Sequence, residues 1–153
     1  MQGTTRGEPN LGKTEPGAND DVALSFIVIT PDEKFHRTLY EIARAGDWRI
    51  TRAASVDEVG MLVWAKPTPM VIYDRDSTNE DWHDAIRRLG ELPTQPCVLL
   101  ASQVADRYLL AEVVRSHGYD ILAKSVTPEK LKQCLRFAWS WARSRARGPG
   151  SSH

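Results

Sequence analysis

Cysteine is scarce in this sequence, with Cys97 and Cys134 the only two among 153 residues. Cys97 opens an apolar run and Cys134 lies on an apolar helical face, so we expect two buried thiols and no disulfide framework. The N-terminal residues lack an apolar stretch after a basic start, so the sequence gives no signal-peptide pattern. The longest apolar runs are too short to span a bilayer. These features together predict a cytoplasmic protein without a membrane partner.

An excess of charge of one sign is also missing, because Lys+Arg and Asp+Glu number 20 each. No global charge therefore directs the protein towards nucleic acid or an anionic membrane. Four arginines do make the outer side of the last helix basic: Arg136, Arg143, Arg145 and Arg147. Such a face could contact nucleic acid or an acidic partner, but we interpret it as a solvated face with cations near a helix C-terminus.

Motifs of common enzymes are missing too. The sequence has no Gly-x-Ser-x-Gly elbow, and its histidines at positions 36, 83 and 117 are scattered without metal-ligand spacing, so we interpret them as solvated side chains. A flavin or nucleotide binder would need a Gly/Ser/Thr-rich loop after the first strand, whose N–H groups hold phosphate. The residues there are Thr30-Pro31-Asp32-Glu33. A nucleotide or flavin binder is thus the weakest alternative, and we expect no enzyme.

Composition divides the chain into three parts. Residues 1–21 are rich in Gly, Pro, Thr, Asn and charge, which predicts a disordered N-terminal arm. Residues 22–146 are long enough for one domain with a sizeable core. Residues 147–153 are expected to form a disordered tail.

Apolar runs with helical patterns between them predict five strands and five helices. Four runs read as buried parallel strands: Leu24–Ile29, Met70–Tyr73, Cys97–Ala101 and Tyr119–Ala123. Trp48 and Ile50 alternate with polar residues, as in a half-exposed edge strand. Right-handed crossovers then give a three-layer α/β/α doubly wound parallel sheet. The flavodoxin-like order 2-1-3-4-5 is one of the two common strand orders, and we expect it because it places the amphipathic second strand at an edge.

Helix ends and stripes are marked by local signals. Asp32 opens the first helix, Gly46 closes it, Ser55-Val56-Asp57-Glu58 is a capping box, and Thr127-Pro128 starts the last helix. Gly118 is expected to be the C-cap of the fourth helix. The apolar stripe of the fourth helix is predicted to be Leu109, Leu110, Val113 and Val114. The stripe of the last helix is predicted to be Leu131, Cys134, Leu135, Ala138 and either Trp141 or Ala142. Among the tryptophans, those at 48, 82 and 141 fit core-facing stripes, whereas those at 64 and 139 fit less well; Trp139 is either a contact residue or an edge-of-core residue.

Four polar residues each follow a strand-like run directly: Thr30, Asp74, Ser102 and Lys124. In an open doubly wound sheet the ligand site lies just beyond the carboxyl ends of the strands. One carboxylate, two hydroxyls and one ammonium should therefore meet in one crevice, which suits an anion held against a carboxylate. Ser102 could equally cap the fourth helix, and the two roles are compatible.

This pattern resembles the receiver domain of bacterial two-component response regulators, from about Leu24 to about Arg143. The resemblance implies that Asp74, in Val71-Ile72-Tyr73-Asp74, accepts a phosphoryl group from a histidine kinase. It further implies that Ser102 contacts this group and that Lys124 pairs with it. A phosphoryl group adds about −1.5 to −2 charge, which an ammonium and a hydroxyl can bind.

The sequence also departs from the family pattern. In the family, two adjacent acids after the first strand help to hold Mg²⁺, and here these positions are Thr30 and Pro31. This replacement should weaken the metal site and leave only Asp32, Asp74 and Asp76 as ligands. The proline expected after the lysine is Ser125, so a trans bond is expected. The aromatic switch position holds Ile121, and Tyr119 should lie farther from the site. The Met-Pro that usually follows the acceptor is also missing from residues 75–80.

Two functions follow from this resemblance. The first is a stand-alone receiver-like signalling protein of a phosphorelay, which accepts a phosphoryl group on Asp74 and switches a protein-binding face. Its partners would be a histidine kinase or phosphotransfer protein, a downstream protein, and a second copy bound through the last helix and its neighbours. The alternative is a pseudo-receiver that binds proteins without phosphate chemistry.

Overall fold

The computed structural model describes residues 24–76 and 81–151, with side chains up to residue 145. The strands are β2 (Ser25–Ile29), β3 (Arg49–Arg52), β4 (Met70–Asp74), β5 (Cys97–Ser102) and β6 (Asp120–Ala123). The helices are α3 (Glu33–Ala45), α4 (Val56–Ala65), α5 (Trp82–Gly90), α6 (Arg107–Arg115) and α7 (Pro128–Ser151). The predicted boundaries of the N-terminal arm lie outside the described residues.

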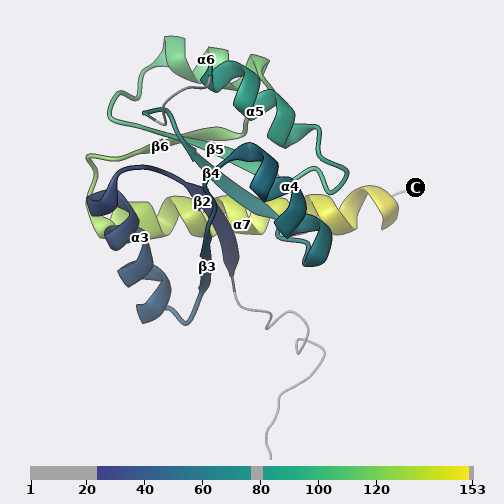
Figure 1. Cartoon of the computed structure of the whole chain (residues 1–153), viewed down its shortest axis with the longest axis horizontal. Helices are drawn as coiled ribbons and strands as arrows, with labels where there is room; N and C mark the ends of the chain where they lie inside the picture. The colour runs from purple at the N-terminus through teal and green to yellow at the C-terminus, as the bar shows by residue number, and fades with distance from the viewer. Residues whose placement is uncertain (1–23, 77–80, 152–153) are drawn as a thin grey trace, which may run out of the picture.

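These strands form one parallel sheet in the order β3-β2-β4-β5-β6, which confirms the predicted 2-1-3-4-5 topology. Helices cover both faces of the sheet (Figure 1). Apolar side chains of α3 and α7 pack on one face, and those of α4, α5 and α6 pack on the other. β4 and β5 lie inside the sheet and are buried throughout, whereas β3 lies at an edge and is mostly exposed. Burial on both faces explains the continuous apolar runs of the inner strands.

Side-chain caps start the helices where the sequence placed them. Asp32 accepts a hydrogen bond from the Phe35 N–H at 3.1 Å, and Ser55 accepts one from the Glu58 N–H at 3.1 Å. The Glu58 carboxylate binds the N–H of Ala54, one residue earlier than the reciprocal bond of a standard capping box. At α6 the cap is Asp106, which accepts from the Leu109 N–H, so the expectation that Ser102 caps this helix is wrong.

The fourth helix, α6, buries a narrower stripe than predicted. Leu109 and Val113 are buried, whereas Leu110 and Val114 are 37% and 55% exposed. Positions four residues apart share one helix face, while the next residue is turned about 100° away, so a short helix on a sheet needs only one row. Two exposed apolar residues thus remain on its outer side.

Gly118 is not the C-cap that the sequence predicted. Ser116 caps α6, and the left-handed residue is His117, with φ of 73°. Gly118 is instead required by close packing, because a Cβ there would lie 2.6 Å from Cγ1 of Val113 and 3.2 Å from Cγ2 of Ile86.

The last helix corrects the assignment of Trp141 and one boundary, and it confirms Trp139 as an edge-of-core residue. Ala142 takes the core position, Trp141 is 39% exposed, and Trp139 packs against the core. α7 also continues to Ser151, past residue 146, where a loose tail was expected. Each added helical residue needs only its own backbone hydrogen bond, so a helix can extend beyond its apolar stripe.

The remaining expectations concern thiols, tryptophans and peptide bonds. Cys97 is buried and Cys134 is half-buried, and neither is in a disulfide. Trp48 and Trp82 pack partly buried against the two cores, whereas Trp64 is 85% exposed. No cis peptide bond occurs in the described residues, which confirms a trans bond after Lys124. No described helix combines the length and apolar character that a membrane span needs.

Candidate functional site

The carboxyl edge of the sheet brings four strand ends together. Asp74 and Ser102 are the last residues of β4 and β5, Thr30 follows β2, and Lys124 follows β6. Thr30, Asp74 and Ser102 are all buried, at 5%, 0% and 1% exposure. The predicted crevice is therefore assembled from segments that are far apart in the sequence.

Asp74 is bound by three hydrogen-bond donors. Its Oδ2 atom accepts from Thr30 Oγ1 at 2.5 Å and from Lys124 Nζ at 2.8 Å. Its Oδ1 atom accepts from the backbone N–H of Asp76 at 2.9 Å. A fully buried carboxylate without such partners would be very costly, so these donors are what allows an aspartate at the end of a core strand.

Lys124 supplies the positive charge of the site. Its Nζ atom lies 2.8 Å from Asp74 Oδ2, 2.9 Å from Asp32 Oδ2 and 3.3 Å from Asp76 Oδ2, and its side chain is only 2% exposed. Burial lowers the pKa of Lys124, but the hydrogen bonds and charges of Asp74 and Asp32 outweigh it, and the net pKa is raised above the usual value. The ammonium is therefore held charged.

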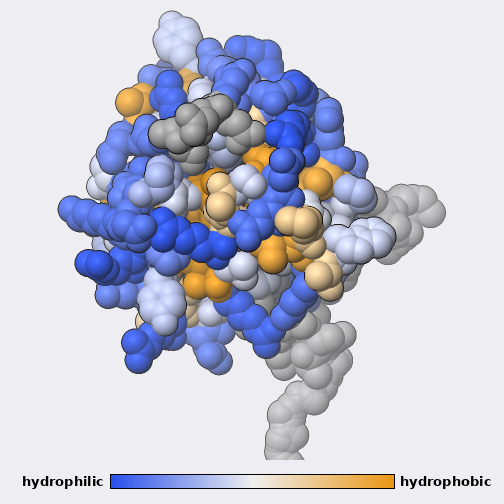
Figure 2. Space-filling view, in the orientation of Figure 1, coloured by the Kyte–Doolittle hydropathy of each residue, from blue (hydrophilic) through white to orange (hydrophobic). Residues whose placement is uncertain are grey.

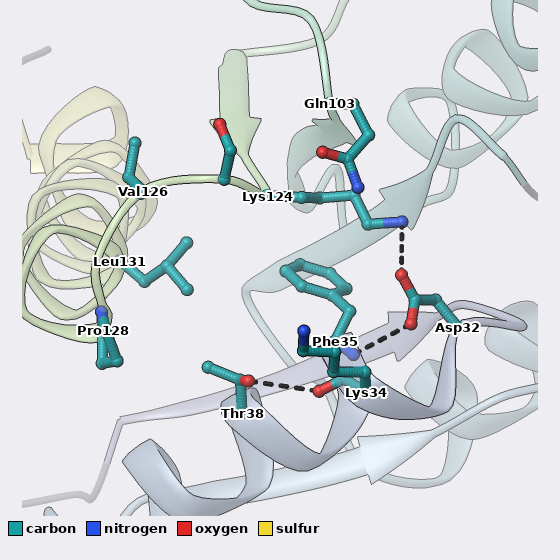
Figure 3. Close-up of a pocket in the computed structure, with 10 residues that line it drawn as sticks. Asp32, Lys34, Phe35, Thr38, Gln103, Lys124, Val126, Pro128 and Leu131 are labelled. Carbon is teal, nitrogen blue, oxygen red and sulfur yellow. Dashed lines mark hydrogen bonds and ion pairs between the residues drawn. The ribbon is translucent and has the colours of Figure 1, made fainter.

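Asp32 has two roles in the site. One oxygen caps α3 through the Phe35 N–H, and the other faces the Lys124 ammonium, as Figure 3 shows. The hydrogen bond from Lys124 lowers the pKa of Asp32 most, followed by the backbone hydrogen bond from Phe35. The position of this carboxylate is thus determined by the start of a helix, which a reading of metal-ligand spacing does not reveal.

Thr30 orients the loop between β2 and α3. Its hydroxyl donates to Asp74 and accepts the Asp32 N–H at 3.0 Å, so it bridges the strand end and the helix cap. Arg52, on the edge strand β3, donates to the Thr30 carbonyl at 2.7 Å and to Glu33 Oε1 at 3.0 Å. Both ends of this loop are therefore hydrogen-bonded.

Ser102 lies beside Asp74 on the neighbouring strand, but its hydroxyl is engaged elsewhere. It accepts the Val104 N–H at 3.1 Å and a guanidinium N–H of Arg75 at 3.4 Å. No hydrogen bond joins Ser102 to Asp74 in the part of the chain that the structure describes. Arg75 was not predicted as a site residue, although its place directly after Asp74 was the available signal.

A small pocket of about 360 Å³ adjoins the ammonium of Lys124 (Figure 3). Asp32, Phe35 and Leu131 line it, and so do Lys34, Thr38, Gln103, Ser125, Val126 and Pro128. The Phe35 ring lies between the pocket and the site, with its centroid 5.2 Å from Lys124 Nζ. The pocket therefore lies beside a Lys124 side chain that is itself almost fully covered.

Geometry argues against Mg²⁺ among the predicted ligands. Asp32, Asp74 and Asp76 direct one oxygen each at the Lys124 ammonium, and Thr30 donates a proton to Asp74. Among the described side chains, no group of three or more His, Cys, Asp or Glu is arranged to hold a metal ion. In this arrangement the predicted ligand set does not fit the ion.

Two other sequence expectations concern aromatic and histidine side chains. Tyr119 packs against Trp141, with ring centroids 4.6 Å apart and the rings tilted by 34°, and it precedes β6 at the end opposite to Lys124, away from the site as expected. His83 is not simply solvated: its ring nitrogens lie 3.0 Å from Asp81 Oδ1 and 2.9 Å from Glu112 Oε1, so it bridges α5 and α6. Twenty-nine residues separate His83 from Glu112, so sequence spacing could not show this contact.

The fold and this edge-of-sheet site define the class of structure: the chain has the fold of response regulator receiver domains. It is similar to a response regulator from Thermotoga maritima, with 16% identity, a TM-score of 0.69, and coverage of 78% of this chain and 99% of that chain. It is also similar to the chemotaxis response regulator CheY4 of Vibrio cholerae, with 11% identity, a TM-score of 0.69, and coverage of 76% and 99%. A CheY-like receiver domain protein from Methanospirillum hungatei JF-1 matches with 10% identity, a TM-score of 0.69, and coverage of 80% and 98%. No family model and no curated protein matches the sequence.

Proposed function

We propose that this chain is a receiver-like signalling protein that accepts a phosphoryl group on Asp74. The observation that carries the proposal is the contact of 2.8 Å between Asp74 Oδ2 and Lys124 Nζ at the carboxyl edge of a receiver fold. The two residues are 50 positions apart in the sequence, so only the fold brings them together. The comparisons support the fold, and the residue contact supports the role.

The side chains around Asp74 suit this chemistry. An oxygen of the Asp74 carboxylate would form a bond to phosphorus while the bond from phosphorus to the donor's leaving atom breaks. The product carries about −1.5 to −2 charge. Lys124 and Arg75 together offer two positive charges, and Arg75 already contacts the Ser102 hydroxyl at 3.4 Å. Two side-chain cations therefore supply charge that a divalent ion could otherwise contribute.

Exposed apolar side chains on α6 and α7 are candidates for partner binding. α6 exposes Tyr108 and Val114, at 84% and 55%, and α7 exposes Phe137 at 73%. We propose that a histidine kinase or phosphotransfer protein, a downstream partner, or a second copy binds here. α4 exposes further apolar residues on a face that is otherwise mostly hydrophilic (Figure 2).

Acetyl phosphate provides the direct test of this function. Incubating the protein with it, with and without Mg²⁺, should add the mass of one phosphoryl group, and peptide mapping should place it on Asp74. Asp74→Asn should abolish the adduct, while Asp76→Asn, an aspartate on the rim of the same site, should keep it. An adduct that persists in Asp74→Asn would show that the acceptor is wrongly assigned.

A phosphorylation-independent pseudo-receiver is the second candidate. It is favoured by the three donors that already bind the Asp74 carboxylate and by Thr30, which stands where the resemblance expects an acid. This function predicts no adduct on the folded wild type. It also predicts that Asp74→Asn binds the same partner as wild type with unchanged affinity.

A further inference from the structure

Lys124 has the surroundings of a bound cation rather than those of an ordinary lysine. Three carboxylates, Asp32, Asp74 and Asp76, each place one oxygen within 3.3 Å of its Nζ atom. The ammonium donates hydrogen bonds to Asp74 and Asp76 and forms an ion pair with Asp32. The side chain is 2% exposed, and the Phe35 ring lies on another side of it. We call the three carboxylates with the Phe35 ring the ammonium cage.

Distances in the cage decide which cation it fits. The oxygens lie 2.8, 2.9 and 3.3 Å from the central nitrogen. Charge-assisted N–H···O bonds are about 2.7–2.9 Å long, whereas Mg²⁺ needs oxygens at about 2.0–2.1 Å and Ca²⁺ at about 2.3–2.6 Å. Each carboxylate would have to move inward by roughly 0.7–1.3 Å to bind Mg²⁺. Two of them are restrained, because Asp32 caps α3 and Asp74 is held by Thr30.

We propose that this edge of the sheet is an ammonium site rather than a metal site, with Lys124 as its built-in cation. The carboxylates select a monovalent cation that donates hydrogen bonds, and they do not bind Mg²⁺ in its presence. The pocket of about 360 Å³ beside Lys124 gives a small alkylammonium ion a route into the cage once the lysine side chain is removed. This inference concerns the resting site and does not depend on phosphoryl transfer to Asp74.

Chemical rescue tests the proposal directly. Lys124→Ala removes the atoms from Cγ to Nζ, which propylammonium matches in length and charge. The loss of a buried cation among carboxylates should lower the thermal unfolding midpoint by about 10 °C. With a dissociation constant of about 10 mM, propylammonium chloride at about 100 mM should raise the midpoint of this variant by about 4 °C over the same concentration of NaCl.

Lys34→Ala is the matched control, because Lys34 lines the same pocket but is exposed. Propylammonium should not stabilise this variant or the wild type beyond NaCl. MgCl₂ at matched ionic strength should stabilise neither the wild type nor Lys124→Ala. Rescue of Lys124→Ala by propylammonium alone supports an ammonium site.

Three results would overturn the proposal. The first is a Mg²⁺-specific rise in the midpoint of the wild type, which decides the question even if Lys124→Ala does not fold. The second is stabilisation of Lys124→Ala by Mg²⁺ to at least the same extent as by propylammonium. The third is a propylammonium effect no larger in Lys124→Ala than in Lys34→Ala. None of these measurements involves a phosphoryl donor, so a negative acetyl phosphate test would leave them unaffected.

Discussion

Replacing Thr30 by valine should destabilise the protein more than the removal of any other side-chain oxygen from the loop between β2 and α3. Valine keeps the shape of threonine, so the change removes only a hydroxyl that is buried in a 5% exposed residue. The hydroxyl donates to the charged Asp74 carboxylate at 2.5 Å and accepts the Asp32 N–H at 3.0 Å. A bond to a charged group is worth about 1.5–3 kcal/mol and a neutral one about 0.5–1.5 kcal/mol, so the loss should be about 2–4 kcal/mol.

Urea unfolding followed by circular dichroism measures this loss. With an m-value of about 2 kcal/mol/M, the midpoint of Thr30→Val should fall by about 1–2 M. Thr38→Val is the control, since the Thr38 hydroxyl donates to the Lys34 carbonyl on an exposed part of α3, and it should change stability by less than about 0.5 kcal/mol. Equal losses in Thr30→Val and Thr38→Val would refute the bridging role of Thr30.

A double-mutant cycle with Asp74→Asn extends the same test. If Thr30 acts through the carboxylate, the effect of Thr30→Val should be smaller when the charge at position 74 is absent. The two changes should then deviate from additivity by about 1–3 kcal/mol. Strictly additive effects would mean that the hydroxyl acts mainly through the Asp32 N–H.

Three further predictions concern packing, pH and thiol reactivity. Gly118→Ala should lower the free energy of unfolding by about 1–3 kcal/mol, because its Cβ would lie 2.6 Å from a buried valine methyl. Gly60→Ala, inside α4 with its nearest contact at 3.7 Å, should raise the free energy of unfolding by about 0.5–1 kcal/mol. Urea unfolding measures both, and a Gly118→Ala variant more stable than Gly60→Ala would contradict this reasoning. His83 has a raised pKa, mainly through its hydrogen bond to Asp81 and with a contribution from Glu112, so its stabilising effect should be complete below the ordinary histidine pKa of 6.5 and be lost as pH rises through the folded-state pKa. His83→Gln should remove this part of the pH dependence, and an unchanged stability–pH curve would exclude it. Burial raises the pKa of the Cys97 thiol to about 12, so a thiol reagent at neutral pH should label Cys97 only at the rate of unfolding, and fast labelling of the native protein would disprove its burial.

Local pattern was sufficient for the framework of the fold. The buried strands β4 and β5 are continuous apolar runs, and their period and length predict them without knowledge of their neighbours. Asp74 and Lys124 could be placed at one edge because the carboxyl ends of parallel strands lie on the same side of a sheet. That reasoning needs strand order and direction only.

Other features depended on packing that the sequence does not encode locally. Leu110 and Val114 have the same apolar character as their buried neighbours, yet the sheet below α6 has room for one row only. Trp141 and Ala142 are adjacent, so an error of one residue in the predicted helix register exchanges which of them faces the core. His83 and Glu112 meet because α5 and α6 lie side by side on one face.

By itself the sequence determined an α/β alternation, the strand order and the convergence of an aspartate, a serine and a lysine at one rim, since these follow from hydrophobic periodicity and chain topology. Only the tertiary structure decided what those side chains bind. The Asp74 carboxylate takes a hydroxyl of Thr30 and the ammonium of Lys124, while Ser102 turns to Arg75. A hydrogen bond requires its donor and acceptor atoms to be placed to within a few tenths of an ångström. This precision arises from caps, loops and packing that act together, not from residue spacing along the chain.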